Sequence, residues 1–293
     1  MKQWLLIVSL AFFFCSCEKA INFKLDQTQP SLVVEATIEN NQPPTVILSS
    51  SFDYFSAISA DLLASSFVHN AVITISNGVK THQLKEYSYN TAANLKIYYY
   101  SIDSANLATA FLGSFNTAYS LTINANGKTY TATTTIPFVA KRVDSLWWKK
   151  APDNPDSNKV VLVGSFTDPV GYGNYIRYFT KVNRDPYYPG LQSVFDDQIT
   201  DGKTYTLNIE RGVDRNVKLD RENYSYFEKG DTITLKFANI DKATYDFWRT
   251  MEYSYQSIGN PFSSPTKVLG NVNGALGYFG GYAAQYTSII VPK

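Results

Sequence analysis

The chain has 293 residues, with 26 Lys and Arg against 25 Asp and Glu. Because its net charge is near zero and no run of basic residues occurs, a nucleic-acid partner is not expected. Its length is enough for one large or two medium domains, and its 22 tyrosines, with many threonines and serines, favour a mainly β protein.

The chain begins with the build of a secretory signal. Lys2 supplies a short positive region, and an uninterrupted run of apolar or small residues follows from Trp4 to Phe14. A membrane-spanning helix needs about 20 apolar residues, roughly twice the length of this run. We therefore expect the segment to be inserted and cleaved rather than kept as a permanent span.

Cys15 and Cys17 are the only cysteines of the chain. A disulfide between them would close over a single residue, where the required geometry is strained. A lipoprotein signal fits better, because such a signal needs a small residue before the acylated cysteine. Ser16 precedes Cys17, whereas the bulky Phe14 precedes Cys15. We predict residues 1–16 to be a lipoprotein signal peptide and Cys17 to be the lipid anchor.

Lipidation would tether the mature chain to a membrane surface. Two or more acyl chains, palmitate among them, give stable attachment, since each buried methylene contributes about 0.8 kcal/mol. Residues 17–30 show no clear period and are predicted to be a lipidated tether. No cysteine follows Cys17, so we expect a fold without a disulfide or a cysteine-ligated zinc ion.

Short stretches rich in β-branched residues, bounded by Asn, Gly or Pro, predict strands in the first half. Asn77-Gly78 and Asn126-Gly127 each predict a type I′ hairpin turn, because both residue types tolerate positive φ. A loop with a short helical turn is expected between Phe52 and Phe67. About seven short strands at this spacing predict an immunoglobulin-like β-sandwich over residues 31–138. The predicted strands and hairpins cover residues 31–39, 44–52, 71–84, 94–103 and 118–137.

A polar, proline-marked stretch from Pro137 to Pro155 follows, and we place the domain boundary near Val139. Residues 139–293 are predicted to form a second β-rich domain that carries one helix. The predicted strands of this domain cover residues 159–168, 174–183, 202–212 and 230–240.

The helix is predicted near residues 241–258. Asp241 can cap its N-terminus, and Gly259 can end it. An apolar stripe, which we expect to lie on a sheet, recurs at helical spacing at Trp248, Met251, Tyr255 and Ile258.

The glycine-dense segment from Gly270 to Tyr282 is not followed by a helix, so it lacks the helix N-terminus that would hold a phosphate. Its glycines suit bulges or a close approach of two backbones within a strand. We predict a buried, tightly packed closing segment.

Nothing in the sequence nominates a nucleophilic enzyme. No thiol remains after Cys17, and the only two histidines, His69 and His82, flank one hairpin. A G-x-S-x-G serine motif is missing. We interpret both histidines as ordinary strand or loop residues and predict no catalytic residue.

Two groups of carboxylates are candidates for calcium ligands. Asp196 and Asp197 lie near Asp201, and Asp153 lies near Asp156. Turns also favour aspartate, because its side chain accepts hydrogen bonds from nearby backbone amides, and we prefer this interpretation. No cofactor or metal is predicted. A hydrolase with two carboxylates facing each other across a cleft stays open as a weaker alternative.

Clusters of aromatic residues are the remaining candidates for a site. Tyr98 to Tyr100 lie in a predicted strand and are interpreted as packing residues. Tyrosine is enriched at interfaces because it combines a large contact area with a hydroxyl group. Two clusters, DPYYPG and NYSYFEKG, therefore give the candidate interface residues, which are Tyr187, Tyr188, Tyr224, Tyr226 and Phe227.

Five segments occur in order from about Ile21 to Tyr282. They are SLVVEATIE, YSLTINANGKTYTATTTIP, FTDPVGYGNYIRY, FDDQITDGKTYTL and NPFSSPTKVLGNVNGALGYFGGY. Together with the lipid signal, they resemble a family of Bacteroidota outer-membrane lipoproteins known chiefly as a domain of unknown function. Genes of this family often lie beside those of TonB-dependent receptors.

The resemblance implies a lipoprotein that works with a TonB-dependent channel in nutrient uptake, and it brings no catalytic residues. We therefore expect a non-enzymatic accessory or binding subunit whose partner is an outer-membrane β-barrel. A subunit of outer-membrane assembly or secretion machinery and a stand-alone glycan- or peptide-binding module are alternatives. We expect a lipid-anchored protein of the outer membrane, on the cell surface rather than the periplasmic face, although Glu18 and Lys19 do not begin the acidic run that directs some lipoproteins of this phylum to the surface.

Overall fold

The structure is a computed structural model, and it describes most of the chain after the tether. The signal peptide, Cys17 and the tether up to residue 29 lie outside the described residues, as do Asp153 and Gly259. The lipid anchor therefore stays a prediction. The described residues are 30–52, 59–91, 95–152, 154–258, 260, 263–264 and 266–293.

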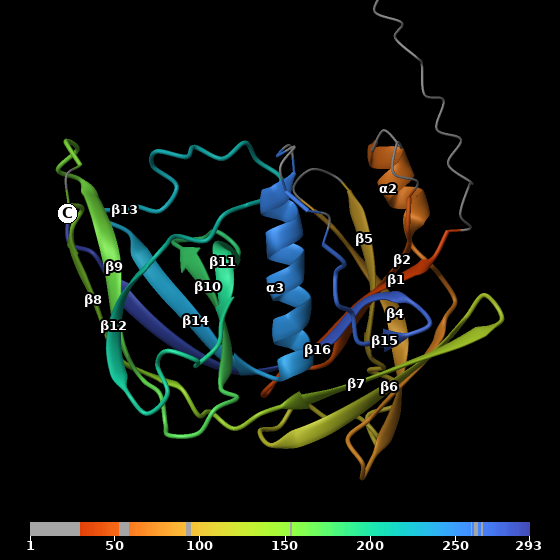
Figure 1. The fold of residues 1–293 in the computed structure, drawn as a ribbon. Helices are drawn as coiled ribbons and strands as arrows, with labels where there is room; N and C mark the ends of the chain where they lie inside the picture. Colours follow the sequence, from red (N-terminus) through yellow and green to blue (C-terminus); the bar gives the residue numbers. More distant parts are fainter. Residues whose placement is uncertain are drawn as a thin grey trace, which may run out of the picture.

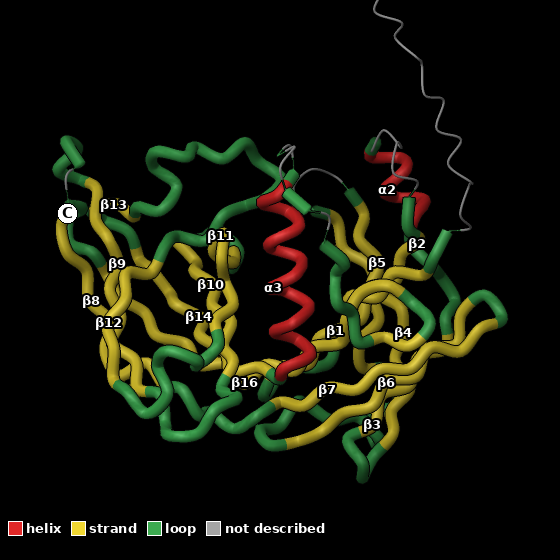
Figure 2. The backbone as a smooth tube through the Cα atoms, in the orientation of Figure 1, coloured by secondary structure: helices red, strands yellow, loops and turns green. Residues whose placement is uncertain are grey.

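The predicted mainly β class is confirmed, because 50% of the chain is strand and only two helices are described. Figure 2 shows these two helices in red among the strands. The helices are α2 (Ala60–Ser66) and α3 (Lys242–Ser257). The strands are β1 (Leu32–Glu39), β2 (Thr45–Ser50), β3 (Val72–Ser76), β4 (Thr81–Asn90), β5 (Lys96–Ile102), β6 (Thr117–Ala125), β7 (Lys128–Ile136), β8 (Arg142–Lys150), β9 (Lys159–Thr167), β10 (Tyr175–Val182), β11 (Tyr188–Phe195), β12 (Thr204–Ile209), β13 (Phe227–Glu228), β14 (Thr232–Ile240), β15 (Val272–Asn273) and β16 (Leu276–Ile290).

The strands form one large and one small sheet. The large sheet has twelve strands in the order β11-β10-β14-β16-β1-β2-β5-β4-β3-β6-β7-β15, and the small sheet has the order β12-β9-β13 with β8 also paired to β9. In Figure 1 the small sheet stands at the left, α3 near the centre, and β10, β11 and β14 between them. The immunoglobulin-like arrangement of residues 31–138 stays a prediction.

Strand β16 joins the two halves of the chain. Its residues 276–282 pair in parallel with β1, and residues 282–290 pair antiparallel with β14. Phe279 and Ala283 of this strand belong to the same apolar core as the strands of the first half. A strand from the predicted second domain thus completes the sheet of the predicted first one. The boundary near Val139 itself stays a prediction.

The glycine-dense closing segment is tightly packed, as predicted, but the predicted burial holds only in part. Residues 278–282 are buried, whereas Gly270, Asn273, Gly274 and Leu276 are exposed. Phe279 is fully buried. Gly277 has a φ of +99°, and a Cβ atom at this position would lie 1.9 Å from the backbone oxygen of Val34. A Cβ atom at Gly281 would lie 2.4 Å from the backbone oxygen of Thr135. These glycines therefore allow β16 to approach neighbouring backbones that any larger residue would displace.

The first half follows the predicted strands closely, with α2 at the predicted helical turn. Asn126 and Gly127 both have positive φ, which confirms the type I′ turn there. The type I′ prediction at Asn77-Gly78 is wrong, because only Gly78 has positive φ. The side-chain oxygen of Asn77 instead accepts hydrogen bonds from the amides of Val79 and Lys80. Glycine at the first central position is the pattern of a type II′ turn.

Two strands, β8 and β11, lie where no strand was predicted. Strand β8 lies within the stretch from Pro137 to Pro155, and β11 begins at Tyr188. Both strands pair irregularly: β8 shifts register between Val143 and Ser145, and the pairing of β10 with β11 shifts near Arg177. A bulge interrupts the alternation of apolar and polar residues by which a strand is predicted.

Helix α3 begins after Asp241, as predicted. One carboxylate oxygen of Asp241 accepts from the amide of Thr244. The other accepts from the hydroxyl of Thr134 and the amide of Thr135, so the cap also fixes the start of the helix to β7.

The predicted stripe of α3 is only partly right. Tyr255 is 42% exposed and Ile258 is 77% exposed, whereas Phe247 and Glu252 are buried against the sheet. The predicted stripe contains only apolar residues, whereas the buried face of the helix includes the carboxylate of Glu252. Neither described helix combines the length and apolar character that crossing a membrane requires.

Candidate ligand-binding cavity

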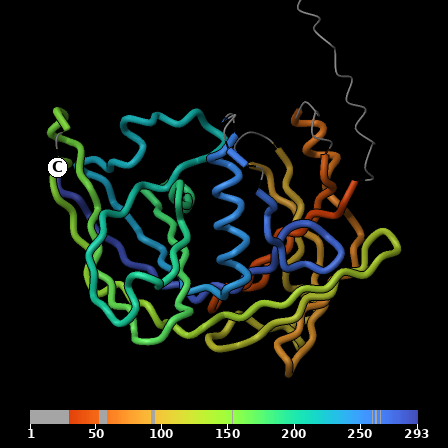
Figure 3. The backbone as a smooth tube through the Cα atoms, in the orientation of Figure 1, coloured from red at the N-terminus to blue at the C-terminus, as the bar shows by residue number. Residues whose placement is uncertain are grey.

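A cavity of about 1260 Å³ lies in the second half of the chain. Its walls come from β10, β11 and β14 of the large sheet, from β9 and β12 of the small sheet, from α3, and from the segment 210–226 between β12 and β13. Figure 3 shows this segment as a teal loop. The loop runs along the top of the molecule toward the upper end of α3. The cavity therefore lies between the two sheets.

The inner wall of the cavity is apolar. Phe166 of β9 stacks on Phe237 of β14 and on Tyr205 of β12, with ring centroids 5.0 and 5.7 Å apart. Two lining residues at the rim, Ile199 and Val217, are 83% and 63% exposed. The cavity is therefore open to solvent at a rim that is itself partly apolar.

Tyrosine hydroxyls supply much of the polar chemistry of the cavity. Burial and the negative charge of Asp168 raise the pKa of Tyr205 to about 12. Burial and the nearby Glu210 likewise raise the pKa of Tyr178 and of Tyr224. These hydroxyls are uncharged near neutral pH, so they can donate and accept hydrogen bonds but do not act as phenolate nucleophiles.

A buried polar cluster fixes the segment 210–226 to α3. The guanidinium of Arg215 donates to Glu252 Oε1 at 3.3 Å and lies 5.2 Å from the ring centroid of Tyr255. Glu252 also accepts from the backbone amide of Ser193 in β11 at 2.9 Å. Helix α3, strand β11 and the covering segment therefore meet at one carboxylate. Because that carboxylate is only 4% exposed, its partners must all be in place.

Two further hydrogen bonds join tyrosines to acids of the same segment. Tyr224 donates to Glu210 at 3.5 Å, and Tyr188 donates to Asp214 at 3.2 Å. Burial, followed by the charge of Asp214, raises the pKa of Tyr188. Both carboxylates line the cavity, and each is already engaged with a hydroxyl.

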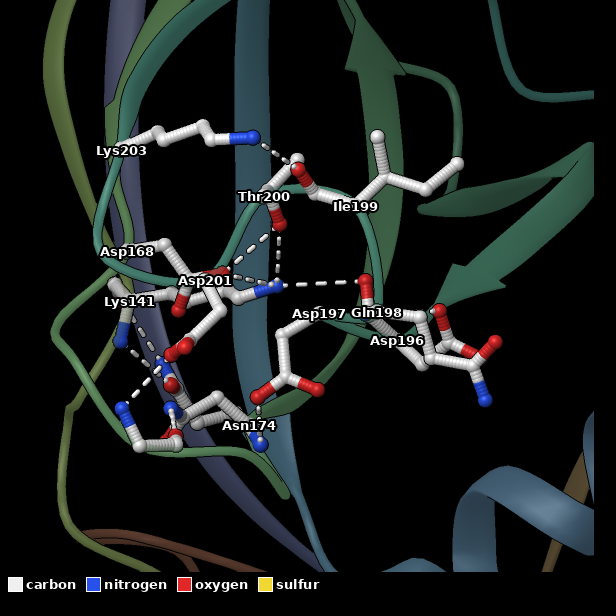
Figure 4. A network of polar contacts seen from close by, with 12 residues as sticks. Lys141, Asp168, Asn174, Asp196, Asp197, Gln198, Ile199, Thr200, Asp201 and Lys203 are labelled. Carbon is white, nitrogen blue, oxygen red and sulfur yellow. Dashed lines mark hydrogen bonds and ion pairs between the residues drawn. The ribbon is translucent and has the colours of Figure 1, made fainter.

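A buried ion pair holds the loops at one end of the cavity (Figure 4). Lys141 Nζ lies 2.9 Å from Asp168 Oδ2, and both side chains are almost fully buried. Lys141 also donates to the backbone oxygen of Asp196 and to Thr200 Oγ1, and Thr200 donates to Asp168 at 2.7 Å. Asp196 and Thr200 line the cavity. The ion pair therefore positions the loop that forms this part of the wall.

The sequence was compared with protein families and with curated proteins. A family model described as "Domain of unknown function (DUF4249)" matches residues 18–288. The chain belongs to the DUF4249 family. No curated protein matches the sequence. The predicted resemblance to a family of unknown function is thus confirmed, whereas the lipoprotein character and the bacterial phylum stay predictions.

The aspartates of this DUF4249 chain that we considered as calcium ligands bind backbone amides. Asp197 accepts from the amide of Asn174 at 2.7 Å, and Asp201 accepts from that of Gly171 at 2.6 Å. Asp196 accepts from the amide of Gln198 at 3.3 Å and from the hydroxyl of Tyr245 at 3.0 Å. Asp156 accepts from the amide of Asn158 at 2.9 Å. These contacts agree with the turn interpretation. Within the described part of the chain, no three metal-binding side chains gather in one place.

Neither histidine lies at the cavity. His82 is buried, its Nε2 accepts from the amide of Asp103 at 3.0 Å, and its Nδ1 lies 2.8 Å from Thr109 Oγ1. Burial lowers the pKa of His82, although Asp103 opposes this shift. His69 Nδ1 lies 2.6 Å from Glu86 Oε1. Both histidines therefore make ordinary structural contacts, as interpreted from the sequence.

The five candidate interface residues of this DUF4249 chain, four tyrosines and one phenylalanine, do not form one surface. Tyr224 lines the cavity, and Tyr188 contacts the lining residue Asp214. Tyr187 is 38% exposed and packs edge-on against Tyr286 of β16. The other two face cores: Tyr226 packs on the cluster around Val161, and Phe227 is fully buried between the sheets. Phe227 is therefore not available to a partner in this structure.

Sequence reasoning missed Arg215, Glu210 and Glu252 as site residues. Arg215 and Glu210 lie in a 17-residue stretch without strand alternation, in which charges of both signs are mixed with Val213 and Leu219. Long irregular segments inside a compact fold are commonly functional. The length and irregularity of this stretch therefore could have pointed to Arg215 and Glu210. The burial of Glu252 had no comparable signal, because it depends on a partner in β11.

Proposed function

We propose that this DUF4249 chain is a non-enzymatic binding protein, anchored by Cys17 in the outer membrane and working as an accessory subunit of a TonB-dependent transporter. The observation that carries the proposal is the cavity of about 1260 Å³ between the two sheets. Ligand pockets are commonly about 300–1,000 Å³, with mostly apolar walls and a few polar groups. The cavity is somewhat larger than this range, and its inner wall is likewise apolar with polar groups around it.

The chemistry of the lining favours binding over catalysis. No serine, cysteine or histidine is among the described residues that line the cavity. The pKa values of the lining residues Tyr178, Tyr205 and Tyr224 are raised, so these hydroxyls are neutral. Its acids Glu210 and Asp214 are hydrogen-bonded to tyrosines. A ligand would therefore meet apolar surface, neutral hydroxyls and charged groups such as Lys218 and Arg221, rather than an activated nucleophile.

The membrane and the partner enter the proposal from the sequence. The lipoprotein signal around Cys17 supports a tether, and the resemblance supports a TonB-dependent barrel as the partner. We place the protein on the outer membrane, facing the cell surface. A subunit of outer-membrane assembly or secretion machinery would use the same kind of partner and is an outcome of the test below.

The cavity is tested with a fluorescent apolar dye, 1-anilinonaphthalene-8-sulfonate, on the mature polypeptide carrying Cys17→Ala, which lacks only the acyl group. We expect saturable binding. Val194→Trp places an indole in the cavity, since Val194 is a lining residue, and should weaken dye binding by about tenfold or more. Val72→Trp is the control, because Val72 is 45% exposed in β3 and does not line the cavity. Equal binding by both variants would refute the cavity as the site.

The partner is tested on the lipidated chain. Membranes are solubilised in mild detergent, the protein is captured, and its partners are identified by mass spectrometry. We expect a large TonB-dependent barrel, and labelled palmitate on the unmodified chain but not on Cys17→Ala. A barrel of the assembly or secretion machinery would instead support the alternative. Capture of the lipoprotein alone would contradict both.

A further inference from the structure

Strand β12 is an open edge of the small sheet. It pairs with β9 on one side, and among the described residues no other strand pairs with it. The neighbouring residue Lys203 accepts a hydrogen bond from the amide of Asp168 at 3.0 Å. This contact continues the β12–β9 register, in which Tyr205 lies opposite Phe166 and Leu207 opposite Gly164.

The register shows which backbone groups of β12 are free. In an antiparallel pair, the residues whose N–H and C=O groups point to the partner strand alternate with residues whose groups point away. Since the carbonyl of Lys203 accepts from Asp168, directly after β9, the backbone groups of residues 205, 207 and 209 also point toward β9. The amides and carbonyls of Thr204, Thr206 and Asn208 therefore point outward. The backbone contacts of the described residues include no partner for these groups.

This edge lacks the features that usually protect an exposed strand. Proline, lysine, inward charges and bulges keep edge strands from pairing with another chain. Strand β12 reads TYTLNI, without a charge or a proline, and its register with β9 is uninterrupted. Leu207 is 47% exposed. An unprotected, β-prone edge of this kind indicates a place where another strand pairs.

The edge runs beside the cavity. Tyr205, Leu207 and Ile209 project from one face of β12 and all line the cavity, and Val194 and Phe195 of β11 line the opposite side. A strand added to β12 would thus project every second side chain toward the apolar space.

The facing edge strand, β11, is already capped. Glu252 accepts from the amide of Ser193, Gln256 donates to the carbonyl of Leu191, and Val213 donates to that of Pro189. Side chains of α3 and the backbone amide of Val213 thus occupy backbone groups of β11. Of the two edge strands beside the cavity, β11 and β12, only β12 is available to pair with another strand.

We propose that the cavity takes an extended peptide of about six to eight residues, which adds to β12 as a further strand and places alternate apolar side chains in the cavity. This proposal rests on the proposed function, since it requires the cavity to bind a ligand. A peptide is favoured over a lipid or a glycan because only another backbone presents donors and acceptors at the spacing of the free groups on β12. Main-chain hydrogen bonds also make the recognition tolerant of sequence.

The first test measures hydrogen exchange on the mature polypeptide carrying Cys17→Ala. The probe is the octapeptide Lys-Val-Thr-Val-Thr-Val-Thr-Lys, and an isomer with its valines and threonines in two blocks is the control. We expect the alternating peptide to slow exchange at the amides of Thr206 and Asn208 by about tenfold or more, and the isomer to do so less. The amides at 205 and 207, already bonded to β9, should change little. Unchanged exchange at Thr206 and Asn208 would overturn the proposal.

The second test removes one outward amide. Thr206→Pro deletes this donor, and proline is tolerated where an edge strand faces solvent. We expect Thr206→Pro to bind the alternating peptide at least about tenfold more weakly, and Thr206→Ala, which keeps the amide, to bind it within about twofold of the unmodified chain. Equal binding by the two variants would refute strand addition. Should Thr206→Pro not fold, the exchange measurement on the otherwise unmodified chain decides by itself.

The dye separates the two proposals. If 1-anilinonaphthalene-8-sulfonate binds in the cavity and the octapeptide does not, the peptide proposal fails while the binding function stands. If neither binds, both fail. If the octapeptide binds and Thr206→Pro keeps dye binding while losing the peptide, both are supported.

Discussion

Replacement of Lys141 by methionine tests whether the buried ion pair organises the end of the cavity. Methionine keeps an unbranched apolar side chain of similar length and removes the charge. In the unmodified chain, the side chain of Lys141 is 1% exposed and that of Asp168 is 0% exposed. Lys141→Met would leave the Asp168 carboxylate with only the hydroxyl of Thr200 as a side-chain donor.

The expected loss follows from this isolation. Removal of one partner of a buried ion pair costs about 3–5 kcal/mol, because the remaining charge stays away from water. Little compensation is at hand, since Asp168 Oδ1 already has no hydrogen-bond partner among the described residues. At roughly 2 °C for each kcal/mol, the melting temperature should fall by roughly 6–10 °C.

Thermal and urea unfolding, followed by circular dichroism, measure this loss. Lys242→Met is the matched control, because Lys242 and Asp246 form an exposed pair within α3, and such pairs contribute only about 0.3–0.5 kcal/mol. The double variant Lys141→Met with Asp168→Asn should recover part of the loss, since it removes the stranded charge. A loss in Lys141→Met no larger than in Lys242→Met would refute the reasoning, as would a double variant that is less stable than Lys141→Met.

Two further predictions concern a buried histidine and a glycine. Burial lowers the pKa of His82 below its ordinary value of 6.5. As the pH falls, the histidine is therefore protonated in the unfolded chain before it is protonated in the folded one. The free energy of unfolding should decrease as pH falls from 6.5 through the lowered pKa. A pH series of urea unfolding should show this slope in the unmodified chain and a shallower one in His82→Asn; equal slopes would contradict the prediction. Gly277→Ala should cost more than about 3 kcal/mol, because it adds a clash with the Val34 carbonyl to the strain of positive φ. Gly78→Ala, at φ +83° with open space around it, should cost about 1 kcal/mol, and equal losses at the two glycines would argue against the clash.

Local signals in the sequence were sufficient for much of the fold. The turn at Asn126-Gly127 and the cap at Asp241 depend on residues a few positions apart, and both lie where we predicted them. The glycines of the closing segment also gave a correct prediction, because a residue without Cβ has few other uses inside a strand. By contrast, β8 and β11 were missed, since irregular pairing interrupts their alternation.

The candidate site was much less accessible to sequence reasoning. Lys141 lies in a polar, proline-marked stretch, and its partner Asp168 is 27 positions away, directly after β9. Glu252 occupies a helix position where exposure is the normal expectation for a carboxylate. Their burial is decided by contacts between segments distant in the chain, which no short pattern records. The same holds for β12, whose residues predicted a strand but not that its outer edge would be left open.

Strand β16 has a consequence for how the chain acquires its structure. Residues 276–290 leave the ribosome after both of the strands that they join, β1 and β14. Until they arrive, β1 and β14 each lack one neighbouring strand, and the strand pairing that joins the two halves cannot form. Contacts this distant in sequence slow folding, since the intervening chain must be brought together first. The twelve-stranded sheet therefore cannot be complete before residues 276–290 are available to pair.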